Sequence, residues 1–147
     1  MSRLALKNGD DHPEAAKKHL SHAEALSKAG YPDGAAYLAG YVVECSLKSV
    51  MLLQTNAPNP KWRGKDGHDL PKLHSDFIDL TTLAGSKIGR YVSTAVKSLP
   101  RAAILAWNPE MRYRAPSIGH TEAANWVDHA RLVYSETVGK MILDGVI

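Results

Sequence analysis

Apolar residues recur every three or four positions along most of the chain, and this spacing is typical of α-helices that bury one face. The spacing predicts helices over residues 12–29, 32–54, 70–84, 86–107 and 121–143. No segment alternates apolar and polar residues with the period of a β-strand. The pattern therefore predicts an all-α fold, an up-and-down bundle of four to five helices.

Residues that start or stop helices stand near the ends of these segments. Asp11, Asp69 and Thr121 precede or open three of them and can cap their first turns. Gly30 and Gly85 follow two of the predicted ends, where glycine is favoured. A proline at position 100 must kink or divide the segment 86–107.

The segment 32–54 is apolar nearly all round, so it is expected to be the central helix. One polar strip crosses it, made of Tyr37, Tyr41, Glu44 and Lys48. Glu44 precedes Lys48 by four residues, which favours an ion pair within the helix. Because one bundle partner cannot easily cover so apolar a helix, and residues 12–29 carry a stripe of alanines for close approach, we expect a homodimer.

Composition bounds the class of protein. With 147 residues, 44% of them hydrophobic and 22% charged, we expect one globular domain over residues 1–147 with its core over about 12–143. One cysteine makes no internal disulfide and no cysteine-based zinc site, and we expect no cofactor. No run of about 18 uninterrupted apolar residues and no secretory signal is present, so we expect a cytoplasmic protein outside the membrane.

Positive charge gathers in the middle of the chain. Residues 61–114 hold ten of the 18 lysines and arginines but five of the 15 acidic residues. Such a segment attracts phosphate. The alternative interpretation is an ordinary solvated helix face.

Several side chains could act on a phosphodiester. Arginine presents a planar, always charged fork to phosphate, and histidine exchanges a proton near neutral pH, which together suffice in principle to cleave RNA without metal. The candidates are His68, Trp107, Arg112, Tyr113, Arg114 and His120. In the alternative interpretation Arg112 pairs with Glu44 or Glu110, and the two aromatic residues lie at the edge of the core.

Two other features favour structural roles. His19 and His22 stand three residues apart and could share a metal, but surface histidines are the expected reading and no metal site is predicted. Cys45 lies in an apolar stretch and is expected to be a packing residue.

Three ordered blocks, AAYLAGYVVECSLKSVMLL, GHDLPKL and WNPEMRY, resemble those of the HEPN domain family of helical nucleotide-binding domains. The resemblance implies family positions for Glu44 and Lys48 in the first block and for His68 in the second. In the third it implies positions for Trp107, Arg112 and Tyr113, and the three blocks span roughly residues 13–143.

The resemblance also implies function. Many members of the family are homodimeric, metal-independent ribonucleases with an Arg-x4-6-His motif, some of them toxins of toxin–antitoxin pairs. Others are inactive modules that bind RNA or nucleotide beside a nucleotidyltransferase. Arg63 with His68 and Arg114 with His120 both fit the motif. We prefer Arg114 and His120 as the catalytic pair because His120 stands at a predicted helix start, and we expect Glu44, Lys48, His68, Trp107, Arg112 and Tyr113 to bind nucleic acid or nucleotide.

Three functions remain open at this point. The first is an endoribonuclease of toxin or defence type. The second is a silent module that binds RNA or nucleotide. The third is a dimeric interaction domain that meets a nucleotidyltransferase antitoxin or another, acidic, protein partner.

Overall fold

The computed structural model describes residues 1–147, and all of its regular structure is helical. The long helices are α1 (His12–Lys28), α2 (Pro32–Thr55) and α5 (His120–Tyr134). The shorter ones are α3 (Leu70–Thr81), α4 (Thr94–Ser98) and α6 (Lys140–Leu143). The predicted all-α bundle is confirmed.

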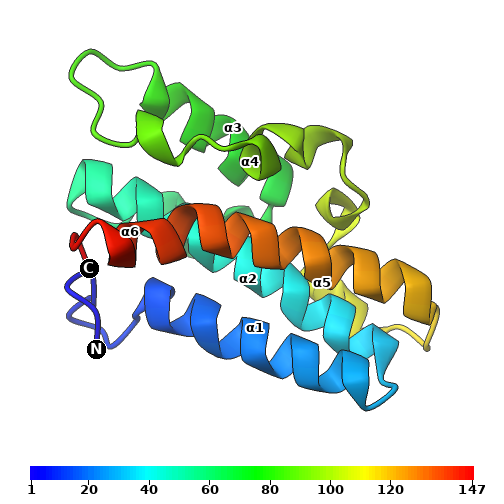
Figure 1. Ribbon diagram of the computed structural model, residues 1–147. Coiled ribbons are helices and arrows are strands. Elements are labelled where there is room, and N and C mark those ends of the chain that lie inside the picture. The colour runs from blue at the N-terminus through cyan, green and yellow to red at the C-terminus, as the bar shows by residue number, and fades with distance from the viewer.

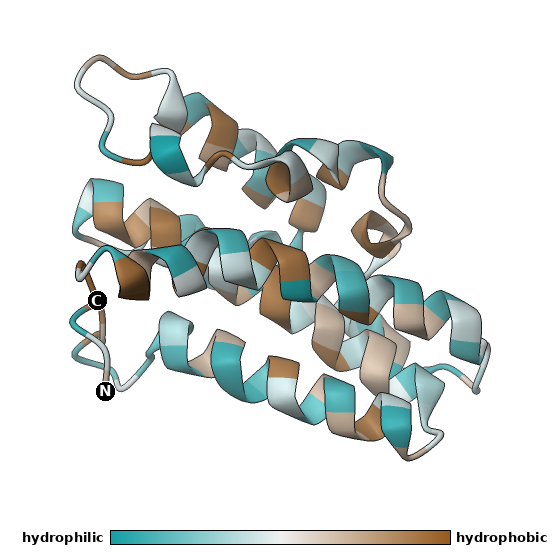
Figure 2. Cartoon of the chain, in the orientation of Figure 1, coloured by the Kyte–Doolittle hydropathy of each residue, from teal (hydrophilic) through white to brown (hydrophobic).

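Helix α2 is the centre of the bundle and packs against α1, α5 and α3 (Figure 1). Every residue from Val42 to Leu52 is buried within the single chain. Figure 2 shows hydrophilic residues along α1 and hydrophobic bands on α2 and α3. The expectation that α2 needs a second protomer for cover is therefore wrong, and the alanine stripe of α1 serves α2 instead, since Ala16 and Ala23 are fully buried.

The predicted boundaries of the first two helices and the start of the third are confirmed to within one residue, whereas α3 ends at Thr81, so the predicted stop at Gly85 is wrong. The Asp11 side chain accepts a hydrogen bond from the Glu14 amide, and Gly30 follows α1 with φ of +84°. Asp69 caps α3 by accepting from the Lys72 amide at 3.0 Å. Helix α5 begins one residue before the predicted start, after Gly119, so Thr121 is not its cap.

The long helix predicted over 86–107 is wrong. Only α4 is α-helical there, and 3₁₀ turns occupy Gly89–Tyr91, Leu99–Arg101 and Ala103–Ala106. The large buried apolar residues are spaced three to five apart, and linked 3₁₀ turns satisfy this spacing as well as an α-helix does. These residues are Ile88, Tyr91, Val96, Leu99, Ile104 and Trp107.

The last predicted helix is divided in the structure by a π-helical turn at Ser135–Gly139. The apolar spacing of residues 121–143 predicts six inward residues, of which five are buried and Tyr134 is half-buried. They are Ala123, Val127, Ala130, Tyr134, Val138 and Met141. After α6 the chain returns to the N-terminal segment, where the Arg3 guanidinium donates to the Gly145 carbonyl at 3.1 Å. Both termini therefore lie at one end of the bundle (Figure 1).

By length and composition alone, α2 could cross a membrane. In this fold, however, 78% of its most apolar window is buried by the rest of the chain, as in the core helix of a soluble protein.

Candidate functional site

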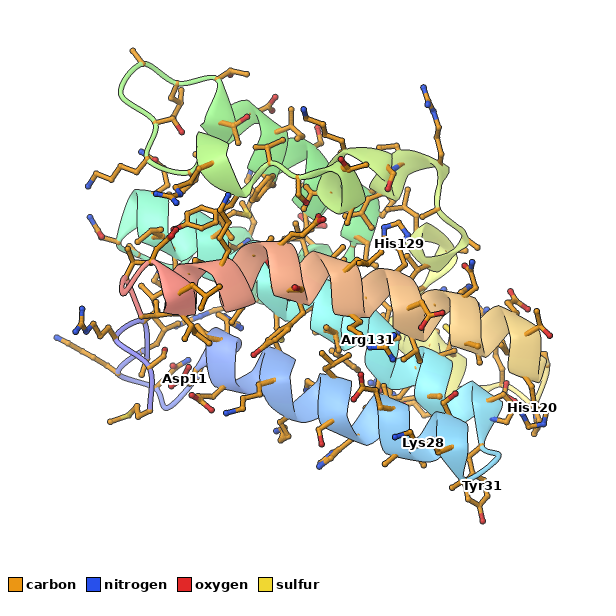
Figure 3. All side chains as sticks on the ribbon, in the orientation of Figure 1. Asp11, Lys28, Tyr31, His120, His129 and Arg131 are labelled. Atoms are coloured by element: carbon orange, nitrogen blue, oxygen red, sulfur yellow. The ribbon has the colours of Figure 1, made fainter.

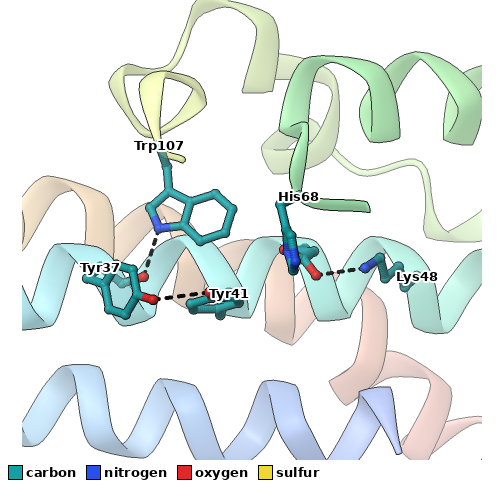
Figure 4. A network of polar contacts seen from close by, with 6 residues as sticks. Tyr37, Tyr41, Lys48, His68 and Trp107 are labelled. Carbon is teal, nitrogen blue, oxygen red and sulfur yellow. Dashed lines mark hydrogen bonds and ion pairs between the residues drawn. The ribbon is translucent and has the colours of Figure 1, made fainter. Parts of the chain in front are cut away.

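A buried carboxylate joins two of the three sequence blocks. Glu44, on α2, is 3% exposed. Its Oε1 accepts a hydrogen bond from Lys48 Nζ at 2.7 Å, which confirms the predicted pair within the helix. Its Oε2 lies 2.9 Å from His68 Nδ1 (Figure 4). Since Lys48 is only 4% exposed, the ion pair is largely withdrawn from water.

His68 is held by the turn that leads into α3. The 3₁₀ turn Lys65–His68 fits under the preceding loop because residue 67 is glycine: a Cβ there would stand 1.9 Å from the Trp62 carbonyl oxygen. With Nδ1 on Glu44, no group of the protein bonds to Nε2, and the side chain is 40% exposed. A carboxylate on one ring nitrogen fixes the orientation and tautomer of an imidazole and leaves the other nitrogen to exchange protons.

Aromatic rings support this site from the side. The Tyr41 ring lies 4.8 Å from that of Trp107 and 6.0 Å from that of His68, both edge-on. The Trp107 Nε1–H donates to the Tyr37 carbonyl at 2.8 Å. Trp107 is only 2% exposed, so it acts here as a packing residue whose ring is not free to stack on a base.

Arg112 does not pair with Glu44. It is exposed, forms no ion pair, and lies over the Tyr113 ring at 4.8 Å. Hydrogen bonding to Tyr113 and then Tyr37 raises the pKa of Arg112, so it faces the tyrosine end of the polar strip. Tyr113 itself is 74% exposed. The alternative interpretation, in which Arg112 pairs with Glu44 or Glu110, is therefore wrong. Lys48 and His68 occupy both oxygens of Glu44, and Arg112 forms no ion pair with Glu110.

Two cavities meet at His68. One, of about 520 Å³, brings Glu44, Lys48 and Arg63 to the same space as His68. The other, of about 650 Å³, is walled by Lys65, His68, Trp107 and Arg112, among others. Five of the six predicted binding residues thus border these two cavities, and Tyr113 contacts Arg112 without lining either of them.

The predicted catalytic pair lies elsewhere. Figure 3 shows His120 beside Tyr31, at the end of the bundle opposite Asp11. Arg114 and His120 are both exposed and border different cavities, of about 220 and 610 Å³. The other match to the motif, Arg63 with His68, shares a single cavity. Only the Arg63–His68 match therefore has both of its members on one cavity.

Burial sets the protonation of several neighbouring groups. Desolvation, reinforced by nearby lysines, lowers the pKa of His12 and of His19. Desolvation and the hydroxyl of Tyr37, 3.1 Å away, raise the pKa of Tyr41. Desolvation raises the pKa of Cys45 to about 12, in keeping with its predicted packing role. His19 stacks on Tyr41, at 5.4 Å between ring centres, and no group of three or more metal-ligating side chains is present.

Two residues of the 520 Å³ cavity carried no signal in the sequence. His12 is the first residue of α1, and Trp62 is the last residue of a 3₁₀ turn, Pro60–Trp62. They meet edge-on at 5.8 Å between ring centres, and Lys48 Nζ lies 5.5 Å from the Trp62 ring. They stand 50 positions apart, and no short motif links them.

Comparison with protein families identifies the class of fold. The HEPN domain family matches residues 10–141, and the chain belongs to this family. The match confirms the resemblance and places the protein among helical domains associated with nucleotides and RNA. Neither the comparison with curated proteins nor that with solved structures gave a match.

Proposed function

We propose that this HEPN domain binds RNA or a nucleotide through phosphate contacts in the two cavities that meet at His68. The observation that carries the proposal is the convergence of Lys48, Arg63 and Arg112 on those cavities. Neither arginine has a carboxylate partner. An unpaired guanidinium offers its full fork of donors to phosphate.

The buried lysine supports the same proposal. Lys48 gives one hydrogen bond to Glu44, and an ammonium group has three to give. The charge of Glu44 is balanced by the Lys48 ammonium, so it repels an anion less than a free carboxylate does. The remaining acid of this cavity, Asp10, already accepts from the Asn8 amide at 2.8 Å.

The test is fluorescence anisotropy of a labelled single-stranded RNA at 50 to 200 mM salt. Log affinity should fall linearly with log salt, by about 0.7 per neutralised phosphate. Arg63→Ala and Arg112→Ala should each weaken binding and, by removing one phosphate contact, reduce that slope by about 0.7. Lys97→Ala is the matched control, since Lys97 is an exposed cation bordering neither cavity. Affinity that is independent of salt, or equal losses in all three variants, would remove the proposal.

A second candidate function is metal-independent cleavage of RNA, of toxin or defence type. It is supported by the Glu44–His68 pair, since an oriented imidazole with a free nitrogen can exchange protons with a substrate. Purified protein with total RNA in EDTA should then yield 2′,3′-cyclic phosphate ends. His68→Gln should abolish the cleavage if this cavity is the site, whereas His120→Gln should abolish it if the Arg114–His120 pair is.

Partners remain proposals of the same kind. We infer a homodimer and a nucleotidyltransferase partner in the cytoplasm from family membership. Sedimentation equilibrium at micromolar concentration tests the dimer, and a mass of one chain, 16.0 kDa, would contradict it. Co-purification with a nucleotidyltransferase co-expressed in the same cells tests the second partner, and free elution of both proteins would contradict it.

A further inference from the structure

A second histidine faces the cavity that holds His68. His12, the first residue of α1, lines the same space of about 520 Å³. Its ring is held edge-on by Trp62, and neither ring nitrogen forms a hydrogen bond with the protein. His12 therefore has two ring nitrogens without a hydrogen bond, and His68 has one. Two such imidazoles in one cavity can together move two protons.

The two histidines are prepared differently. His68 donates Nδ1–H to Glu44, so a proton on its Nε2 would make an imidazolium that is paired with a buried carboxylate. His12 stands at the N-terminal end of a helix, where positive charge is disfavoured. The helix N-terminus thus disfavours an imidazolium at His12, whereas the His68 ring faces a carboxylate.

The surroundings of His12 also favour its neutral form. Desolvation first, and then the charge of Lys48, lower its pKa, and the acids Asp10, Glu44 and Asp11 offset this only in part. The other titratable groups of the cavity are His68 and Arg63. A lowered pKa leaves His12 neutral, with a free lone pair, at pH 7.

We propose that His12 is a second catalytic residue of this cavity and acts as the general base opposite His68. This inference rests on the proposed binding of RNA and on the cleavage candidate at His68. His12 takes the proton of a ribose 2′-hydroxyl while that oxygen bonds to the adjacent phosphorus. The bond from phosphorus to the 5′ oxygen breaks, and His68 Nε2 gives its proton to that oxygen. The products are a 2′,3′-cyclic phosphate and a 5′-hydroxyl end, with no metal or co-reactant.

The cations of the cavity stabilise the negative charge that develops in this step. Two negative charges accumulate on the phosphorane, and preorganised donors are most effective there. Lys48 retains donors beyond its bond to Glu44, and Arg63 has no acid partner. The same two residues bind the ground-state phosphate in the proposed function, so binding and chemistry share one site.

The experiment measures cleavage and binding separately. His12→Gln keeps a polar side chain of similar reach, and His22→Gln is the matched control on the exposed face of α1. Cleavage of a short RNA in EDTA should fall about 10²- to 10⁴-fold in His12→Gln and stay unchanged in the control. Binding of the same sequence with 2′-deoxyribose, which lacks the nucleophile, should be equal in all three proteins.

Two further measurements distinguish a catalytic role of His12 from a structural one. The wild-type pH–rate profile should be bell-shaped, and His12→Gln should lose the limb that rises from acidic pH. Imidazole added to His12→Ala should restore part of the rate. Wild-type cleavage rates in His12→Gln, or joint loss of cleavage and binding, overturn the role of His12. A wild-type protein that binds RNA without cleaving it also overturns this inference but leaves the binding function standing, whereas failure to bind removes the proposed function itself.

Discussion

The indole of Trp107 lies directly on the backbone of Gly40. A Cβ at position 40 would stand 2.1 to 2.2 Å from three atoms of the ring, a distance that forces movement. Gly40 is in the interior of α2, where glycine is otherwise unfavourable by roughly 0.5–1 kcal/mol relative to alanine. Packing therefore requires glycine at position 40, because the missing side chain leaves room for the Trp107 ring, which packs against Tyr41.

Gly40→Ala should destabilise the protein in spite of its better helix propensity. Overpacking of a tight core typically costs about 1–3 kcal/mol, which exceeds the gain in propensity. Urea denaturation of Gly40→Ala measures the loss in free energy of unfolding. Gly34→Ala in the same helix is the control, because its Cβ would meet only the flexible end of Leu26, at 3.2 Å. Equal stability of the two variants would contradict this account of Trp107.

Glu44→Gln should be strongly destabilising. Lys48 would keep its charge at 4% exposure with no carboxylate beside it, and breaking a buried ion pair in this way costs about 3–5 kcal/mol. Denaturant melts at pH 7 give the value. The double variant Glu44→Leu with Lys48→Met should recover much of the loss, because two apolar side chains leave no buried charge. A double variant less stable than Glu44→Gln would contradict this reasoning.

Arg112→Ala should leave thermal stability unchanged. The guanidinium is exposed and has no acid partner, and its contacts are with Tyr113 and Tyr37. Differential scanning calorimetry of the variant and the wild type makes the comparison. A large fall in the melting temperature would show that Arg112 supports the fold, which the geometry does not predict.

Stability should decline as the pH falls below about 6.5. Burial lowers the pKa of His12, His19 and His74 from the ordinary 6.5. The unfolded chain therefore takes up these protons first, which favours unfolding as the pH drops through that range. Above pH 6.5 both states are neutral at these sites and the stability is fully present. Urea melts between pH 8 and pH 5 measure the slope, and His74→Gln should reduce it.

Cys45 should be inert to thiol reagents in the folded protein. Desolvation raises its pKa to about 12, and only the thiolate reacts. Titration with a chromogenic disulfide should show no reaction until urea unfolds the chain, and then one thiol per chain. Rapid modification without denaturant would mean that the centre of α2 opens readily.

Much of the architecture follows from the chain alone. Neighbouring residues decide the helix caps at Asp11 and Asp69 and the stop at Gly30, so these features are local in origin. The central position of α2 follows from its own apolar composition. Where the same apolar spacing suits two helix types, as between Ile88 and Trp107, the sequence pattern misleads. The Glu44–Lys48 pair was predictable for the same local reason, since one helical turn separates the two residues.

The site depended on the tertiary structure. His68 lies 24 positions from Glu44, and His12, Trp62 and Arg63 reach the cavity from a helix start and a loop. Spacing along a chain does not give the distance between segments that loops connect. Arg63 with His68 and Arg114 with His120 both match the Arg-x4-6-His motif, and only the packing distinguishes the two matches. The sequence by itself determined the helices and the types of chemistry available. The packing of α1, the 56–69 segment and α2 decided which of those groups share a cavity, because tertiary contacts bring together side chains that are far apart in the sequence.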